Sequence, residues 1–179
     1  MTGSDITAFD PVVEEDLRSR VGHYLVGSTA GRGVRVGLAC ARFNGAVTVR
    51  LLNGALSALA ESGVDRGDVA LAWAPGAFEL PLLARAFARS SRPVDAVITL
   101  GAVIRGDTGH YEVVAGECAR GVQAVQLETG VPVIFGVLTT NTVEQALERS
   151  LDDETNKGRE AVLTALEMVN VLRHSVFAH

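Results

Sequence analysis

The chain has 179 residues, of which 47% are hydrophobic and 21% are charged, a composition typical of globular rather than disordered proteins. A formal net charge of -5 disfavours nucleic acid as a partner, because a surface that tracks phosphates needs clustered Lys and Arg side chains. No apolar run reaches the roughly 18 residues of a membrane span. Acidic residues lie where a signal peptide would have its apolar segment. We therefore expect no membrane contact and a cytoplasmic location.

In chain order, residues 1–32 are predicted to form an N-terminal arm, ending in a segment rich in glycine and small polar residues that is typical of a flexible linker. Residues 33–175 are predicted to form a single domain in which strands and amphipathic helices alternate. Strands are expected at 34–39, 69–73, 96–100 and 133–138. Helices are expected at 47–59, 79–88, 112–128, 142–150 and 159–173.

Short apolar strands that alternate with helices indicate parallel pairing through right-handed crossovers. The predicted fold is therefore of the α/β class: a three-layer α/β/α sandwich of flavodoxin-like type, with a parallel sheet of four strands and helices on both faces. In such a sheet, ligands bind beyond the carboxyl ends of the strands. Three of the four segments that follow the strands are rich in glycine and polar residues, so we predict a functional site at this edge.

The turn Gly106-Asp107-Thr108-Gly109 precedes a predicted helix, and backbone N–H groups at a helix start can hold a phosphate. Alternatively, Asp107 or Thr108 is a simple N-cap of that helix. His110 follows the turn and is a candidate proton shuttle, because imidazole titrates near neutrality; the alternative is a surface or capping residue.

Phe43, at the end of the first strand, can stack on a planar heterocycle or belong to the core, and core packing is the default for Phe135. Arg149 and Lys157 flank an acidic loop, where they can either bind a phosphate or remain solvated surface charges. Glu79 is either a site residue or a first-turn carboxylate favoured by the helix dipole.

Five segments of the chain together resemble the lumazine synthase family, in the same order and at matching intervals from about residue 34 to residue 173. They are RFN at 42–44, PGAFELP at 75–81, GAVIRGDTGHYE at 101–112, FGVLTTNTVEQALER at 135–149 and NKG at 156–158. Any one of these segments alone would be weak, but five in register are specific.

The resemblance implies an enzyme that condenses 5-amino-6-(D-ribitylamino)uracil with 3,4-dihydroxy-2-butanone 4-phosphate, without cofactor or metal. The products would be 6,7-dimethyl-8-ribityllumazine, phosphate and water, in the penultimate step of riboflavin biosynthesis. The resemblance implies that His110 is the proton shuttle and that Phe43 stacks on the pyrimidine. The substrate-binding residues that it implies are Phe43, Ala77, Phe78, Glu79, Ala102, Val103, Ile104, Asp107, Thr108, Phe135, Arg149 and Lys157.

The same resemblance implies a homo-oligomer with sites at subunit interfaces, Phe135 coming from a neighbouring subunit, and riboflavin synthase as a further partner. The segment 150–155 is acidic and lacks the glycine-rich turn of members that close into sixty-subunit shells, so we expect a pentamer. Asp107 stands where small or neutral residues are frequent in the family, so the turn is expected to bind phosphate through backbone N–H groups. Ala77 replaces a hydroxyl, which matters little if its backbone makes the contact.

Two other functions fit the same fold. A flavin-binding protein without catalysis would also use the aromatic ring of Phe43, and a scaffold that assembles without turnover would retain the fold alone. The combination of His110, Arg149 and Lys157 favours the enzyme, because passive binding of a flavin needs no proton shuttle beside a phosphate site. Cys40 and Cys118 have no metal-type spacing, and we expect both to be reduced thiols.

Overall fold

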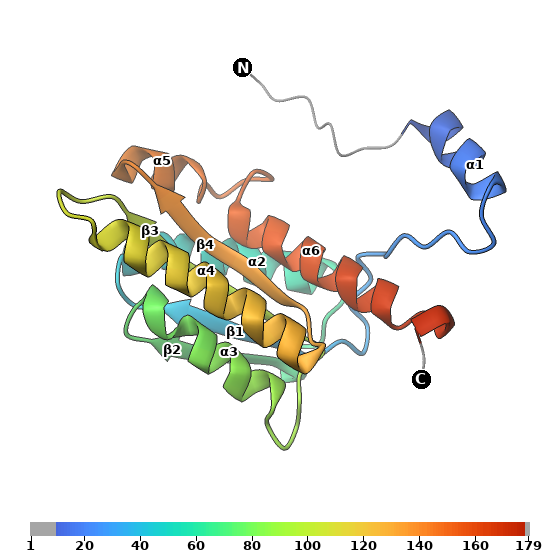
Figure 1. The fold of residues 1–179 in the computed structure, drawn as a ribbon, viewed down its shortest axis with the longest axis horizontal. Coiled ribbons are helices and arrows are strands. Elements are labelled where there is room, and N and C mark those ends of the chain that lie inside the picture. The colour runs from blue at the N-terminus through green and yellow to red at the C-terminus, as the bar shows by residue number, and fades with distance from the viewer. Residues whose placement is uncertain (1–9, 178–179) are drawn as a thin grey trace.

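The computed structural model describes residues 10–177 and shows a four-stranded parallel sheet between two layers of helices (Figure 1). The strands lie in the order β2-β1-β3-β4. Their bounds are Val36–Ala41 for β1, Val69–Ala74 for β2, Ala96–Ile104 for β3 and Val133–Thr140 for β4. The predicted three-layer, flavodoxin-like sandwich is confirmed.

All five predicted helices of the domain are present. Their bounds are Gly45–Glu61 for α2, Leu80–Ala88 for α3, His110–Thr129 for α4, Val143–Glu148 for α5 and Lys157–Leu172 for α6. Short 3₁₀ turns occur at Arg66–Asp68, Ala77–Glu79 and Ser175–Phe177. Helices α2 and α6 pack together on one face of the sheet, and α3 and α4 pack on the other. None of the helices within residues 10–177 is long and apolar enough to cross a bilayer.

Strand β3 continues four residues beyond its predicted end, because Gly101 to Ile104 remain paired with β4 as far as Thr140. Glycine and alanine weaken the sequence signal for a strand, but pairing of this extension with β4 overrides that local preference. The extension carries three of the predicted site residues, Ala102, Val103 and Ile104, to the rigid edge of the sheet rather than into a loop.

Each face of the sheet supports its own core. Leu38 and Leu100 pack with α2 and α6, whereas Ala39 and Val97 pack with α3 and α4. Cys40 lies in the first core and Cys118 in the second, and both are free thiols. Burial raises the pKa of Cys40 to about 12 and that of Cys118 to about 11, so both remain neutral at ordinary pH.

The described part of the N-terminal arm contains a helix that the sequence patterns did not predict, α1 (Pro11–Ser19). Asp10 caps this helix by accepting a hydrogen bond from the N–H of Val12, and none of its residues is buried. Further along, the side chain of Asn170 in α6 donates to the carbonyls of Ser28 and Ala30. Residues 1–9 of the predicted arm lie outside the described residues.

The contact between α2 and α6 depends on a glycine at the start of α6. A Cβ atom at Gly158 would lie 1.9 Å from the carbonyl oxygen of Leu51, a distance that no real contact allows. Because the obstructing atom belongs to the backbone of α2 at the fully buried residue Leu51, α2 and α6 would have to move apart to accept a side chain.

We therefore expect Gly158→Ala to destabilise the protein by about 1–3 kcal/mol through overpacking. Gly116→Ala is the matched control: it also lies in a helix, but a Cβ there meets nothing within 4 Å, and helix propensity favours Ala by up to about 1 kcal/mol. Thermal unfolding at one protein concentration measures both changes. Equal melting temperatures for the two variants would contradict the proposed packing.

Candidate active site

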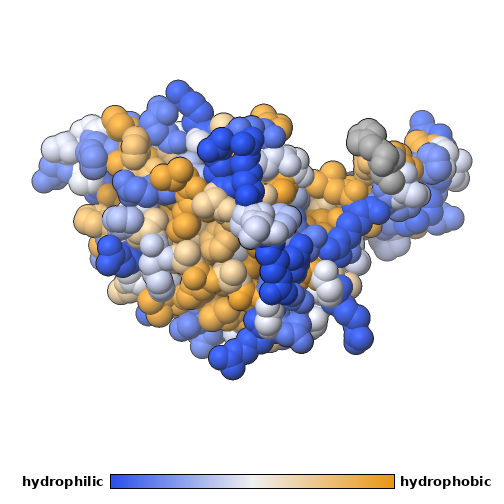
Figure 2. Space-filling view, turned by 90° about the horizontal axis from the view of Figure 1, so that it is seen from below, coloured by the Kyte–Doolittle hydropathy of each residue, from blue (hydrophilic) through white to orange (hydrophobic). Residues whose placement is uncertain are grey.

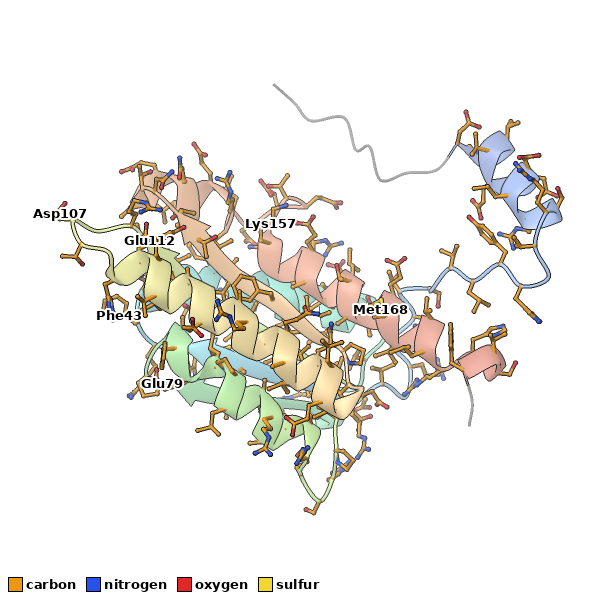
Figure 3. The ribbon with its side chains drawn as sticks, viewed as in Figure 1. Phe43, Glu79, Asp107, Glu112, Lys157 and Met168 are labelled. Atoms are coloured by element: carbon orange, nitrogen blue, oxygen red, sulfur yellow. The ribbon has the colours of Figure 1, made fainter. Side chains whose placement is uncertain are left out.

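A cavity of about 640 Å³ lies at the edge of the sheet where β1 and β3 end. The chain passes from β1 outward to β2, and later from β3 outward to β4, so the strand order reverses between β1 and β3. Ligands of flavodoxin-like folds bind in the crevice at this reversal. Figure 3 shows Phe43, Glu79, Asp107 and Glu112 at this end of the sheet.

This first cavity collects most of the predicted site residues. Phe43 follows β1, the residues around Ala77 follow β2, and the turn before α4 follows β3. The predicted residues that line the cavity are Phe43, Ala77, Phe78, Glu79, Ala102, Val103, Ile104, Thr108 and His110. Asp107 is exposed on the same turn but is not among the lining residues.

Phe43 projects into solvent at the mouth of this cavity, with 72% of its surface exposed, so it is not a core residue. Its backbone N–H donates to the carbonyl of Pro75 at 3.0 Å, which continues the β1–β2 pairing beyond the strands. The next residue, Asn44, has a left-handed backbone (φ 57°), and its side-chain Nδ2 donates to the carbonyl of Ala102 at 2.9 Å. These contacts hold the backbone that carries the Phe43 ring between the ends of β2 and β3.

The turn after β2 presents its backbone to the cavity, while its carboxylate is used locally. Oε2 of Glu79 accepts a hydrogen bond from the N–H of Gly76 at 3.0 Å and so closes the turn Ala77–Glu79. The side chain of Glu79 therefore acts as a first-turn cap, one of the two roles expected for it. The backbone of residues 77–79 and the exposed ring of Phe78 remain at the cavity wall.

The start of α4 lacks a side-chain cap. Its N-cap residue is Gly109, and neither Asp107 nor Thr108 caps the helix. The one side-chain contact there joins the N–H of His110 to Oγ1 of Thr108 at 3.4 Å, which is long for a hydrogen bond. Uncapped N–H groups at a helix start, together with the helix dipole, form an environment that favours a bound anion.

Arg105 and Glu112 flank this turn and form an ion pair across it. The hydrogen bond between them lowers the pKa of the Glu112 carboxyl and raises the pKa of the Arg105 guanidinium. Both groups are therefore charged throughout the pH range in which an enzyme works. Within residues 10–177, no three His, Cys, Asp or Glu side chains lie close enough together to hold a metal ion.

The remaining predicted residues, Phe135, Arg149 and Lys157, line a second pocket of about 510 Å³ along the outer edge of β4. No residue lines both pockets. Figure 3 shows Lys157 at the start of α6, apart from Phe43 and Glu79. Phe135 is 37% exposed on the edge strand, which does not agree with the core packing expected as its default. Within one chain, the predicted site residues therefore lie in two separate groups.

Asn156, a residue that the sequence analysis did not single out for a role, organises the second group. It is buried, and its Oδ1 accepts hydrogen bonds from the N–H groups of Gly158 and Arg159. Its Nδ2 donates to the carbonyls of Leu151 and Arg50. Lys157 is thereby held as the first residue of α6. An Asn directly before a helical pattern is a common N-cap signal, and it could have identified this residue.

Asn44 offers a test of how the first cavity is held. Asn44→Ala removes a hydrogen bond worth about 1 kcal/mol. It also places alanine in a left-handed backbone conformation, which costs a residue with a Cβ atom roughly another 1 kcal/mol. Asn44→Gly removes the hydrogen bond alone. We expect urea unfolding to show a larger loss of stability for Asn44→Ala than for Asn44→Gly. An equal loss would show that the backbone conformation is not strained.

The comparison with known families agrees with this geometry. The family model for 6,7-dimethyl-8-ribityllumazine synthase matches residues 33–173, a range that contains the whole sheet and both pockets. The N-terminal arm predicted at residues 1–32, including α1, precedes the matched range. The chain belongs to the 6,7-dimethyl-8-ribityllumazine synthase family, a family of transferases in riboflavin biosynthesis.

Proposed function

We propose that this chain condenses 5-amino-6-(D-ribitylamino)uracil with 3,4-dihydroxy-2-butanone 4-phosphate to give 6,7-dimethyl-8-ribityllumazine, phosphate and water. The observation that carries the proposal is the shared cavity: an exposed aromatic ring, an uncapped helix start and a histidine surround one space. These groups suit a planar heterocycle, a phosphate and a proton transfer, respectively.

The aminouracil would lie on the ring of Phe43, with the backbone of residues 77–79 and 102–104 beside its polar edge and ribityl chain. The carbonyl of Ala102 already accepts from Asn44, so the backbone beyond Ala102 offers the more accessible polar groups. The phosphate of the second substrate would lie on the turn 106–109. Backbone N–H groups and the Thr108 hydroxyl would bind it, and Asp107 is not among the residues that line the cavity.

The reaction then needs little more than positioning and proton transfer. The amine of the uracil attacks the ketone and water leaves as the imine forms. The phosphate group departs with its bonding electrons, and ring closure releases a second water molecule. His110 is the first residue of α4 and lines the same cavity as Phe43, and from there it would accept and return the protons.

The second pocket would complete a site on another copy of the chain. Phe135, Arg149 and Lys157 lie at the open edge of β4 and have no share in the first cavity of their own chain. Exposed hydrophobic residues on the opposite edge strand and on α3 include Leu71, Trp73 and Leu82. Figure 2 shows hydrophobic residues gathered on the underside of the molecule.

Contiguous apolar surface of this kind marks an interface, and a ring of identical copies would cover it. We infer a homo-oligomer in which the Arg149 guanidinium of one copy adds positive charge to the phosphate turn of the next. A monomer would contain two incomplete sites, so assembly and activity would be lost together.

A steady-state assay with both substrates, followed by lumazine absorbance, tests the proposed reaction. Loss of the imidazole in His110→Ala should lower the rate by about 10²-fold, the usual contribution of a positioned proton shuttle. His174→Ala is the control, because this exposed histidine follows α6, outside both pockets, and the rate should not change. Folded wild-type protein that forms no product would refute the reaction, and tight flavin binding in that sample would favour the binding-protein alternative.

Native mass measurement tests the assembly. The acidic, glycine-free segment before α6 leads us to expect about five subunits of 18.8 kDa in a closed ring. A particle in the megadalton range would show that this segment does not limit assembly, and a monomer would contradict the shared site.

A further inference from the structure

We propose that Arg105 is a positioning residue, whose guanidinium holds the turn 106–109 and His110 against the end of β4. The inference rests on the proposed role of this turn as the phosphate site. Arg105 lines neither pocket, so the role proposed for it is to fix the residues that do.

The turn itself is weakly held. All residues from 106 to 110 are exposed, and α4 begins without a side-chain cap. An anion site built on backbone N–H groups has to leave those groups without intramolecular partners. A side-chain cap at the helix start would occupy the N–H groups that the anion needs. The turn therefore has to be held by the residues on either side of it.

Arg105 provides such an anchor at the first flank. Its backbone N–H donates to the carbonyl of Thr140 at 2.9 Å, and its Nε donates to Oδ1 of Asn141 at 3.0 Å. Its Nη1 pairs with the carboxylate of Glu112, and its Cζ lies 4.1 Å from the centroid of the Tyr111 ring. Arg105 precedes the turn and Glu112 follows it in the first turn of α4, so their ion pair closes the loop of residues between them.

The three side-chain contacts require arginine. A guanidinium is planar and can donate to two acceptors while it stacks on an aromatic ring, whereas an ammonium is a single point of charge. Arg105 and Glu112 keep 42% and 56% of their side-chain surfaces exposed, and exposed ion pairs contribute little to global stability. The contacts are therefore better suited to fixing a local geometry than to holding the fold together.

The contacts also continue toward the second pocket. The backbone N–H of Asn141 donates to Oε1 of Gln145 at 2.9 Å, and Nη1 of Arg149 donates to the carbonyl of Gln145 at 3.0 Å. Arg105 is thus connected, through the segment that follows β4, to the arginine proposed to reach the phosphate in a neighbouring copy. No such contact joins Arg105 to the platform around Phe43.

Because Arg105 contacts the phosphate turn and not the platform around Phe43, its replacement should affect the two substrates differently. The test measures kcat and the KM of each substrate on the full-length, assembled protein. We expect Arg105→Ala and Arg105→Lys each to raise KM for the sugar phosphate about tenfold and to lower kcat by about tenfold, because a misplacement of about 1 Å can cost up to 10²-fold. KM for the aminouracil should stay within about twofold, since Phe43 and residues 77–79 are held by other contacts. Glu112→Gln, which leaves the Asn141 contact, should give a smaller change of the same kind.

The matched control is Arg89→Ala, which removes a similarly exposed arginine bound to Glu128 near the other end of α4. It should leave all the constants unchanged. Kinetic constants of the Arg105 variants equal to those of Arg89→Ala would overturn the proposal, and so would an equal rise in both KM values, which would indicate general loosening.

Hydrogen exchange of the amides of residues 106–111 gives a readout that does not depend on turnover. Exchange there should be faster in Arg105→Ala than in wild type, with the rest of α4 unchanged. Unchanged exchange would overturn the role of Arg105. If wild-type protein forms no product but the difference in exchange is present, the proposed reaction is refuted and the positioning role of Arg105 is supported.

Discussion

Parallel pairing of β1 with β3 is the constraint on which the rest of the structure depends. Because the two strands run side by side and their chains leave toward opposite edges, their carboxyl ends open into a crevice, which the start of α4 helps to line. Asn44 spans this crevice by donating from the end of β1 to a carbonyl of β3. The aromatic ring before it, the turn after β2 and the start of α4 all take their positions from that edge.

In the proposed reaction, the cavity would act mainly through backbone groups rather than through charged side chains. Glu79 is used to close its own turn, and α4 begins without a cap. This arrangement suits a reaction between two substrates that are already activated, because electrostatic demands are modest and placement dominates. Rigid strand ends place atoms more accurately than long loops do, and the extension of β3 to Ile104 brings three predicted residues onto such a strand end.

Much of the fold could be predicted from the sequence because strand and helix periodicities are strong and local. The grouping of site residues could be predicted only in part. The family resemblance implies that Phe135 comes from a neighbouring subunit, but strand and helix patterns alone do not separate Phe135 and Arg149 from Phe43 and His110. The position of β4 at the edge of the sheet supplies the physical reason for the separation. The sequence does not predict the contacts of Asn44 and Arg105 or the hydrogen bond from Asn156 to Arg50, because each joins segments distant in sequence or depends on backbone conformation. The N-cap role of Asn156, in contrast, follows a local sequence signal.

The central claim is that two incomplete groups on one chain form complete sites between copies, and mixed oligomers test it most directly. His110→Ala damages the first group and Arg149→Ala the second, so each variant alone should be nearly inactive. The two variants are then co-expressed in equal amounts, so that they mix in one ring. If sites are shared between neighbouring copies, about one-quarter of the interfaces combine an intact first group with an intact second group. We therefore expect about one-quarter of wild-type activity. Activity no higher than the average of the two variants measured separately would contradict a site shared between copies.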